Sequence, residues 1–250
     1  MFLQPLRKGQ ATSKNRCNGI VVGKRHDSME KAILPSHFSS DKVEPRINPT
    51  DGRIMKITLV GSKYFGQEVL SALAGERGVD IVRIVAPAAD DRLALAAKAR
   101  GIEVVVHADP HVVGPEHIAP DTGLIVTAHC HARVTPAALA KARLGGIGYH
   151  PSLLPRHRGI AAIEWTIKEG DPIAGGSIYH LADRMDAGPL AAQDWCFVRK
   201  GETARQLWER ALAPMGLRLL QEVVRNAAET GEVPAIPQQE EFATKAPLTA

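Results

Sequence analysis

A chain of 250 residues with 44% hydrophobic side chains is long and apolar enough for one large folded domain, which argues against an intrinsically disordered protein. The net charge of +4 comes from residues 1–54, which contain ten Lys or Arg and five Asp or Glu. Residues 55–250 contain 21 Lys or Arg and 22 Asp or Glu, a net of −1, so this part lacks the basic surface of a nucleic-acid-binding domain. Three cysteines without a CxxC pair argue against a disulfide framework or zinc site and favour a reducing, cytoplasmic location, and no apolar run is long enough to span a membrane.

Residues 1–54 form a basic, proline-containing segment without sustained periodicity. We expect a disordered extension, or upstream sequence that precedes the true start, because Met55 opens a clean strand pattern. The absence of acidic residues before Asp27 is shared with organelle-targeting peptides, but the apolar stretch of a secretory signal is missing. The expected division is an extension over 1–54, a folded domain over 55–243 and a tail over 244–250.

Strand-like and helix-like segments alternate from residue 55 onward. Short β-branched runs predict strands over 56–61, 79–85, 102–106, 123–127 and 146–150. Helical spacing of apolar residues predicts intervening helices over 65–74, 91–100 and 136–143. This alternation predicts an α/β fold of the Rossmann-like kind, with a mostly parallel sheet and helices on both faces.

The pattern changes after residue 150. A helix is expected over 160–169, followed by two strands over 175–181 and 190–199 with no room for a crossover helix between them. Those two strands therefore predict an antiparallel edge on the sheet. A long amphipathic helix is expected over 203–228 with a kink at Pro214, and the proline-containing tail is expected to cross the surface.

The turn after the first strand, Gly61 to Gly66, reads GSKYFG. It lacks both the GxGxxG pattern of dinucleotide sites and the GK[ST] of a P-loop. Bound NAD or ATP is therefore not expected, and the turn is interpreted as a tight connection that packs Phe65 under the sheet.

His150 and Asp186 are the candidate acid–base residues. His150 ends the fifth predicted strand, and ligands of open parallel sheets bind beyond the carboxyl ends of the strands. Gly148 and His150 face the same side because side chains alternate along a strand. Asp186 lies in a Met-Asp-Ala-Gly turn, and an Asp paired with a His fixes its tautomer and stabilises its protonated form. The apolar loop 151–155 suits a flat apolar ligand.

Each of these residues also has a purely structural interpretation. A His at a strand end is often solvated or structural, and an Asp before Ala-Gly is often only a turn former. Cys130, near the end of the fourth strand, could be a nucleophile or simply packed. The Arg156–Arg158 segment could bind an anion or be solvated. Four further histidines match no zinc spacing, so no metal is expected: His129, His131, His157 and His180.

The sequence resembles the folate-dependent formyltransferase family. The resemblance is carried by GYHPSLLPRHRG at Gly148–Gly159 and by the Asp-x-x-Asp-Ala-Gly turn at Asp183–Gly188. That family includes glycinamide ribonucleotide, methionyl-tRNA and sugar formyltransferases and formyltetrahydrofolate hydrolases. Residues 55–243 are most similar to the N-terminal hydrolase domain of 10-formyltetrahydrofolate dehydrogenases, with which they share FGQEV at 65–69, the A-I-x-W-T pattern at 162–166, and Pro237-Gln238.

The resemblance implies a formyltransferase fold, 10-formyltetrahydrofolate as co-substrate, and roles for individual residues. His150 would be the catalytic imidazole near the formyl carbon, and Asp186 would orient it and help move the proton from the nucleophile to the leaving N10. The folate-binding residues would be of two kinds. Arg133, Val134 and Thr135, with Leu181, Ala182, Asp183 and Met185, would line the pterin pocket mostly through backbone groups, and Ser152, Leu153 and Leu154 would belong to the loop that shapes the site.

Gly148 departs from the family pattern, because transferases of the family carry an Asn there whose amide stabilises the oxyanion. Loss of one such donor typically costs about 2.7–4 kcal/mol of barrier. The dehydrogenase-type hydrolase domain also lacks this Asn, so Gly148 weakens the case for an ordinary amine transferase without implying an inactive site. Asn restored at this position is expected to raise transfer.

The acceptor expected from the sequence is a small amine or water. The turn after the first strand lacks the Gly-Ser-rich phosphate loop of the glycinamide ribonucleotide enzyme, and no C-terminal barrel domain like that of the methionyl-tRNA enzyme is expected in this chain. A methionyl-tRNA formyltransferase is therefore a minor alternative. A folate-binding or regulatory protein with little turnover is the alternative of a different class. The sequence leaves the oligomeric state open.

Overall fold

The computed structural model describes residues 54–107 and 109–248, so the expectations for the basic N-terminal extension lie outside the described residues. The strands are β1 (Met55–Gly61), β2 (Val79–Ala86), β3 (Glu103–Val106), β4 (Val112–Val113), β5 (Leu124–Ala128), β6 (Arg133–Val134), β7 (Gly146–His150), β8 (Ile173–His180) and β9 (Leu190–Phe197). The α-helices are α1 (Lys63–Leu73), α2 (Arg92–Lys98), α3 (Pro136–Leu139), α4 (Ala162–Lys168), α5 (Ala204–Leu207) and α6 (Ala213–Thr230).

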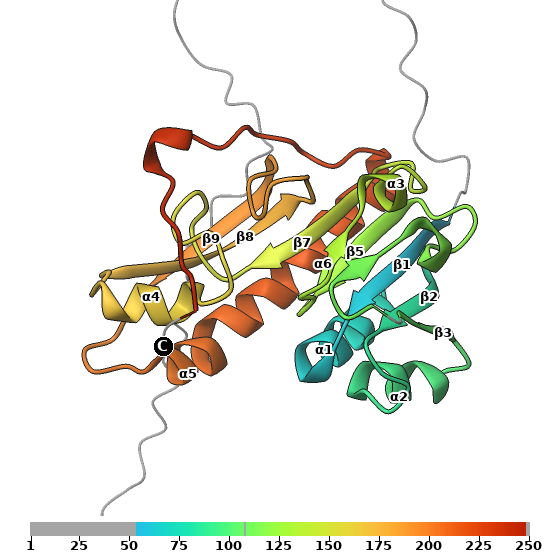
Figure 1. Cartoon of the computed structure of the whole chain (residues 1–250), viewed down its shortest axis with the longest axis horizontal. Helices are drawn as coiled ribbons and strands as arrows, with labels where there is room; N and C mark the ends of the chain where they lie inside the picture. Colours follow the sequence, from blue (N-terminus) through green and yellow to red (C-terminus); the bar gives the residue numbers. More distant parts are fainter. Residues whose placement is uncertain (1–53, 108, 249–250) are drawn as a thin grey trace, which may run out of the picture.

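One seven-stranded sheet forms the frame of the domain, in the order β3-β2-β1-β5-β7-β8-β9 (Figure 1). The strands from β3 to β7 run parallel, and β8 and β9 are antiparallel to their neighbours. The predicted Rossmann-like parallel sheet with an antiparallel edge is therefore confirmed. The edge arises because the short link from β8 to β9 leaves no length for a crossover helix.

The central strands β1, β5 and β7 are largely buried on both faces, as strands inside a covered parallel sheet are, whereas the edge strands β3 and β9 keep exposed side chains. In β1, Ile57 and Leu59 point into the larger core, which α1, α2 and α6 cover. Val60 points to the opposite face and joins a smaller core with Ile125 of β5 and Ala138 of α3. This smaller face is the one on which the functional site is built.

Local features that depend on tertiary contacts differ from the sequence expectations. Residues 112–113 and 133–134 form a separate two-stranded parallel sheet, which the sequence did not predict. The helix expected over 136–143 ends as α-helix at Leu139 and continues as hydrogen-bonded turns to Gly145. Segments this short have no periodicity of their own, so their pairing is set by neighbours.

The long helix expected over 203–228 is three consecutive segments: α5, a π-helical stretch at Trp208–Leu212, and α6. Pro214 lies two residues after the end of the π-helical stretch, in the first turn of α6. Because proline has no amide hydrogen, the carbonyl of Arg210, four residues earlier, receives no hydrogen bond from position 214. The amide of Ala213, just before the proline, donates to the Trp208 carbonyl five residues back, which is the spacing of a π-turn. The predicted irregularity at Pro214 is thus a π-turn that precedes the proline.

The C-terminal segment crosses the surface beside the antiparallel edge, as expected (Figure 1). Ile236 makes a two-way backbone bridge with Leu190 of β9. Arg158 bridges Lys245 in parallel, with its amide donating to the Thr244 carbonyl and its carbonyl accepting from the Ala246 amide. This segment therefore ties β9 to the loop that follows β7.

Candidate functional site

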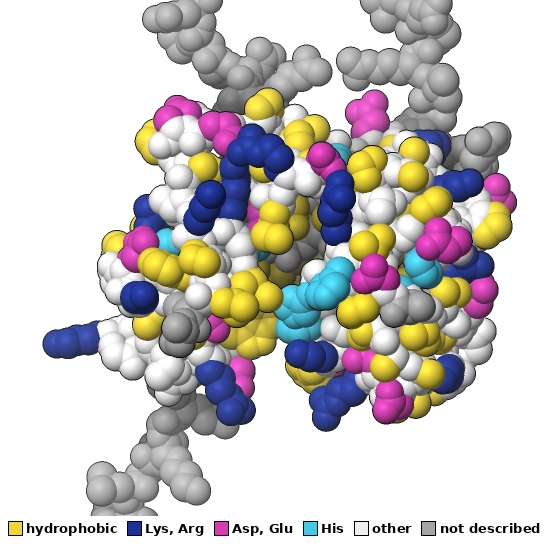
Figure 2. All heavy atoms as spheres, viewed as in Figure 1, with side chains coloured by type: hydrophobic (Ala, Val, Ile, Leu, Met, Phe, Trp, Pro, Cys, Tyr) yellow, Lys and Arg dark blue, Asp and Glu magenta, His cyan; other side chains and the backbone are white. Residues whose placement is uncertain are grey.

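A cavity of about 520 Å³ opens at the carboxyl ends of β5 and β7. Its volume lies in the range of small-molecule sites, roughly 300–1,000 Å³. Figure 2 shows it as a hollow in the middle of this face, with histidine and hydrophobic side chains around it. The position is the one that the sequence predicted, beyond the carboxyl ends of parallel strands.

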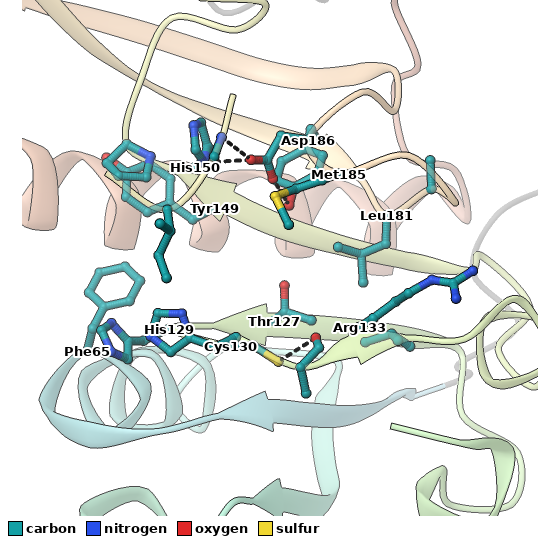
Figure 3. A pocket seen from close by; sticks show the side chains of 18 of the residues that line it. Phe65, Thr127, His129, Cys130, Arg133, Tyr149, His150, Leu181, Met185 and Asp186 are labelled. Carbon is teal, nitrogen blue, oxygen red and sulfur yellow. Dashed lines mark hydrogen bonds and ion pairs between the residues drawn. The ribbon is translucent and has the colours of Figure 1, made fainter. Parts of the chain in front are cut away.

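Strand register brings Thr127, Gly148 and His150 to one face of the sheet. Thr127 of β5 pairs with Gly148 of β7, and His150 follows two residues later on the same side. All three are buried. Gly148 contributes no side chain, and the Thr127 side chain on the neighbouring strand β5 lines the cavity there (Figure 3).

His150 and Asp186 lie together at the cavity wall, with side chains only 8% and 10% exposed. His150 Nδ1 is 3.5 Å from Asp186 Oδ2 (Figure 3). On the other side of the ring, His150 Nε2 is 2.8 Å from the carbonyl oxygen of His157. A carbonyl only accepts hydrogen bonds, so Nε2 carries a proton and Nδ1 is the nitrogen that can take up and return one. The structure thus brings together the two residues predicted as an acid–base pair.

Two donors fix the Asp186 carboxylate. The Tyr179 hydroxyl donates to Oδ1 and the Gly159 amide donates to Oδ2, both at 2.8 Å. Burial first, and then the neighbouring Asp186 charge, raise the pKa of Tyr179 well above its usual value, so the phenol remains a donor. Asp186 has a left-handed backbone (φ 53°), which Asp and Asn tolerate better than most residues.

The C-terminal segment supports the same turn from behind. The Gln238 amide donates to the backbone carbonyls of Asp186, at 2.9 Å, and Gly188, at 2.7 Å. Gln238 also accepts from the Arg158 guanidinium, which pairs with Glu240. That contact lowers the pKa of Glu240 to about 2. The loop after β7 and the Asp186 turn are therefore held by one shared segment.

The segment Arg156–Arg158 is neither an anion site nor simply solvated. Arg156 Nη2 lies 2.7 Å from Glu169 and 3.0 Å from Asp171, and His157 Nε2 lies 2.7 Å from Asp171. In the described part of the chain, His157, Glu169 and Asp171 are the one group whose geometry could hold a metal ion. The Arg156 guanidinium already supplies positive charge to both carboxylates there, so the cluster serves to fix the loop whose His157 carbonyl holds His150.

Six of the ten predicted folate contacts line the cavity: Arg133, Val134, Leu181, Ala182, Asp183 and Met185. Arg133 and Asp183 pair across its outer end, and Met185 is exposed at the rim. Arg133 and Val134 form β6, and the other four residues lie in the turn that follows β8. The groove between them is mixed apolar and polar, and its contact with a folate stays a prediction.

The other four predicted contacts lie outside the cavity lining. Thr135 caps α3 by accepting from the Ala138 amide, and the Ser152 hydroxyl donates to the Arg156 carbonyl. Leu154 is buried with its amide bonded to Ser177, and Leu153 packs against β8 at Gly175. These contacts fix the loops around the cavity, and the predicted part of these four residues in folate binding stays a prediction.

Several cavity residues were missed from the sequence. Thr127 and Tyr179 lie on predicted strands, where nothing local separates a site residue from a core residue. Phe65, Tyr149 and Trp208 form an aromatic wall, with ring centroids of Phe65 5.6 Å from Tyr149 and 5.2 Å from Trp208. Phe65 packs under the sheet as predicted. Because only 4% of the chain is aromatic, the few aromatic residues were the signal in the sequence that could have pointed to this wall.

His129 and Cys130 line the inner side of the cavity without being poised for chemistry. Burial raises the pKa of the Cys130 thiol to about 11, and its Sγ is 3.3 Å from the Ala132 carbonyl. A thiol with so high a pKa is a poor nucleophile near neutral pH. Burial, and then the nearby His131, lower the pKa of His129, which favours its neutral form.

An open α/β sheet with a buried His–Asp pair at its carboxyl edge defines an acid–base site of a Rossmann-like domain. The formyl transferase family model matches residues 55–224. The chain therefore belongs to the formyltransferase family, whose context is folate and one-carbon metabolism.

Curated relatives include 10-formyltetrahydrofolate dehydrogenases. The human cytosolic protein is 38% identical over 202 residues, which cover 76% of this chain but 22% of that protein, and the human mitochondrial protein is 37% identical over a match of the same extent. The chain thus spans about a fifth of the length of these relatives. Methionyl-tRNA formyltransferase of Chlorobium chlorochromatii is 29% identical, covering 77% of this chain and 65% of that protein.

Solved structures share the fold at lower identity. Glycinamide ribonucleotide transformylase 1 from Symbiobacterium toebii has a TM-score of 0.62 at 20% identity, covering 77% of this chain and 100% of that one. An N-formyltransferase from Helicobacter canadensis, in complex with folinic acid and dTDP-3-aminofucose, has a TM-score of 0.62 at 13% identity, covering 77% of this chain and 71% of that one.

Proposed function

We propose that this domain releases the formyl group of 10-formyltetrahydrofolate, passing it to water or to a small amine. The observation that carries the proposal is the buried His150–Asp186 pair at the wall of a cavity of about 520 Å³. Gly148 favours the water reaction, because it supplies no side-chain amide where family transferases carry an Asn, and the Thr127 hydroxyl lies in the space that such a side chain would need.

The chain's own groups supply a complete acid–base cycle. His150 Nδ1 takes a proton from the attacking water or amine, and the Asp186 carboxylate stabilises the imidazolium so formed. The same proton then passes to N10 as the bond from N10 to the formyl carbon breaks. The His157 carbonyl keeps the ring oriented throughout, because its bond to Nε2 is present in both protonation states.

The start of α1 argues against a phosphorylated acceptor. A helix N-terminus after the first strand is a natural place for a phosphate. Here the Asp91 carboxylate accepts from the Lys63 amide at 3.0 and 3.1 Å, and also from the Leu93 amide at 2.8 Å. A carboxylate of the chain itself occupies the position, so water or an uncharged amine is the better acceptor.

Two other functions remain as alternatives. A folate-binding or regulatory protein with little turnover is favoured by the missing side chain at Gly148. Methionyl-tRNA formyltransferase is a minor alternative, supported by the similarity to the Chlorobium chlorochromatii enzyme and opposed by the near-neutral charge of residues 55–250. Among the described residues no helix is both long and apolar enough to cross a bilayer. A cytoplasmic location is part of the proposal, and the matching dehydrogenases include mitochondrial forms as well.

The proposal is tested by incubating the protein with 10-formyltetrahydrofolate without any amine and measuring tetrahydrofolate and formate. Equal, steady release of both establishes the hydrolase reaction. Tight binding without release supports the binding-protein alternative, unless an added amine is formylated, which would establish transfer. No binding at all would refute the folate assignment itself.

A further inference from the structure

We propose that the Thr127 hydroxyl is a catalytic group, which donates a hydrogen bond to the formyl oxygen when that oxygen becomes negatively charged. The inference deepens the proposed function and rests on it. Addition of any nucleophile to a formyl carbon moves the carbonyl electron pair onto oxygen, and a buried site must supply a donor for that charge. The question is which group in this cavity can do so.

The cavity offers three hydroxyl side chains in the described part of the chain, and two are already engaged. The Tyr149 hydroxyl donates to the Leu212 carbonyl at 2.7 Å, and the Tyr179 hydroxyl donates to Asp186 at 2.8 Å. The Thr127 hydroxyl has only a long contact of 3.3 Å to the Ile147 carbonyl. Ordinary hydroxyl hydrogen bonds are about 2.7–2.8 Å, so this weak contact is readily exchanged for a charged acceptor.

The position of Thr127 suits the role. Thr127 pairs with Gly148, which precedes His150 by two residues on β7. Neighbouring strands are about 4.8 Å apart and a strand rises about 3.3 Å per residue, so the Cα atoms of Thr127 and His150 are about 8 Å apart. Both side chains are on the same face of the sheet. A small planar formyl group fits between them, with its carbon toward His150 and its oxygen toward the hydroxyl.

Gly148 and Thr127 act as a pair in this arrangement. A Cβ at Gly148 would lie 2.5 Å from Thr127 Oγ1, so the hydroxyl occupies the place that a side chain at 148 would need. The absence of a side chain on β7 is what exposes a hydroxyl from β5 to the cavity. The donor thus comes from the neighbouring strand, while residue 148 itself contributes no side chain.

The chemical step is balanced with this donor. Water or an amine forms a bond to the formyl carbon and loses a proton to His150 Nδ1, while the oxygen accepts from the Thr127 hydroxyl. The carbonyl re-forms, the bond to N10 breaks, and N10 receives the proton from His150. Thr127 keeps its own proton throughout, so its contribution does not depend on pH.

The test compares Thr127→Val, which keeps the shape and removes the hydroxyl, with Thr127→Ser, which keeps the hydroxyl. Thr127→Val is expected to lower kcat about 10²-fold by the same factor at every pH, with KM for the formyl donor changed by less than about twofold. Thr127→Ser is expected to stay within about threefold of the unaltered protein. Thr58→Val, which alters a buried threonine of β1 bonded to Thr122, is the matched control and should leave kcat unchanged.

Three results would overturn the inference while the unaltered protein still turns over. These are a Thr127→Val variant with normal kcat, a Thr127→Ser variant as impaired as Thr127→Val, and a loss seen with water but absent when hydroxylamine is the nucleophile. The last would mean that the hydroxyl holds a water molecule, since charge on the formyl oxygen is common to every nucleophile. An inert unaltered protein would instead refute the proposed function, and the inference with it.

Discussion

Replacing Gly148 with alanine tests how tightly the floor of the cavity is packed. The added Cβ would lie 2.5 Å from Thr127 Oγ1, 3.3 Å from Leu181 Cδ2 and 3.4 Å from Tyr179 Cε1. The first contact is about 0.9 Å too short, against the 3.4 Å at which ordinary van der Waals contact begins. A β-branched side chain on a buried, hydrogen-bonded strand moves little. We therefore expect Gly148→Ala to destabilise the fold by about 1–3 kcal/mol, as overpacking does.

The same substitution should be harmless once Thr127 is shortened. Thr127→Ala removes the clashing hydroxyl, and alanine in place of a strand glycine then stabilises by about 0.5–1 kcal/mol. A double-mutant cycle of the two alanine variants, measured by urea unfolding, should show a coupling of at least about 1 kcal/mol. In thermal unfolding each 1 kcal/mol corresponds to about 2–4 °C for a domain of this size.

Additivity within about 0.5 kcal/mol would refute this packing, because sites that do not touch show no more coupling than that.

The result also bears on restoring the family asparagine. Gly148→Asn alone should be destabilised without a gain in turnover, contrary to the sequence-based expectation, since its Cβ meets the same hydroxyl. Thr127→Ala with Gly148→Asn should recover more activity than Thr127→Ala alone, because the space is then open to the amide.

Three further predictions concern the surroundings of the pair. Because burial raises the pKa of Cys130 to about 11, its thiol should react slowly with iodoacetamide at pH 7, and about tenfold faster for each pH unit up to 11. Cys130→Ala should keep full turnover. Rapid labelling of Cys130 at neutral pH would contradict the expected thiol reactivity. Tyr179→Phe leaves Asp186 Oδ1 without its hydrogen-bond donor. Losing a buried hydrogen bond costs about 1–3 kcal/mol, so kcat should fall by about tenfold or more. An unchanged kcat would rule out the positioning role of Tyr179. Gln238→Ala releases the Asp186 and Gly188 carbonyls, so kcat should fall and the C-terminal segment should be cleaved faster in limited proteolysis; unchanged rates of both would show that the segment does not support the site.

The parallel sheet was predictable because its strands are short, largely apolar and β-branched runs that alternate with helical patterns, and such runs need only local patterning to be recognised. His150 was predictable as a site residue for the same reason: it ends one of those strands. The two-residue strands β4 and β6 were not, since their residues pair only after the loops around the cavity are in place.

Functional details that depend on register could not be derived from the sequence. Thr127 faces the cavity only because β5 pairs with β7 so that it stands opposite Gly148. Tyr179 reaches Asp186 because the turn after β8 folds back onto that strand. Ser152 was placed in the folate pocket by resemblance, yet its hydroxyl closes its own loop through Arg156. Which side chains of a loop face inward is decided by such contacts.

The measurement that tests the central claim most directly is single-turnover release of formate from bound 10-formyltetrahydrofolate by the unaltered protein, His150→Ala and Asp186→Asn. Asn is chosen at 186 because it tolerates the left-handed backbone there. Binding of tetrahydrofolate is measured in parallel. We predict unchanged binding and release slowed by about 10²–10⁴-fold in both variants, the range of acid–base catalysis. Full release rates in either variant, with binding intact, would contradict the assignment of this pair as the catalytic centre.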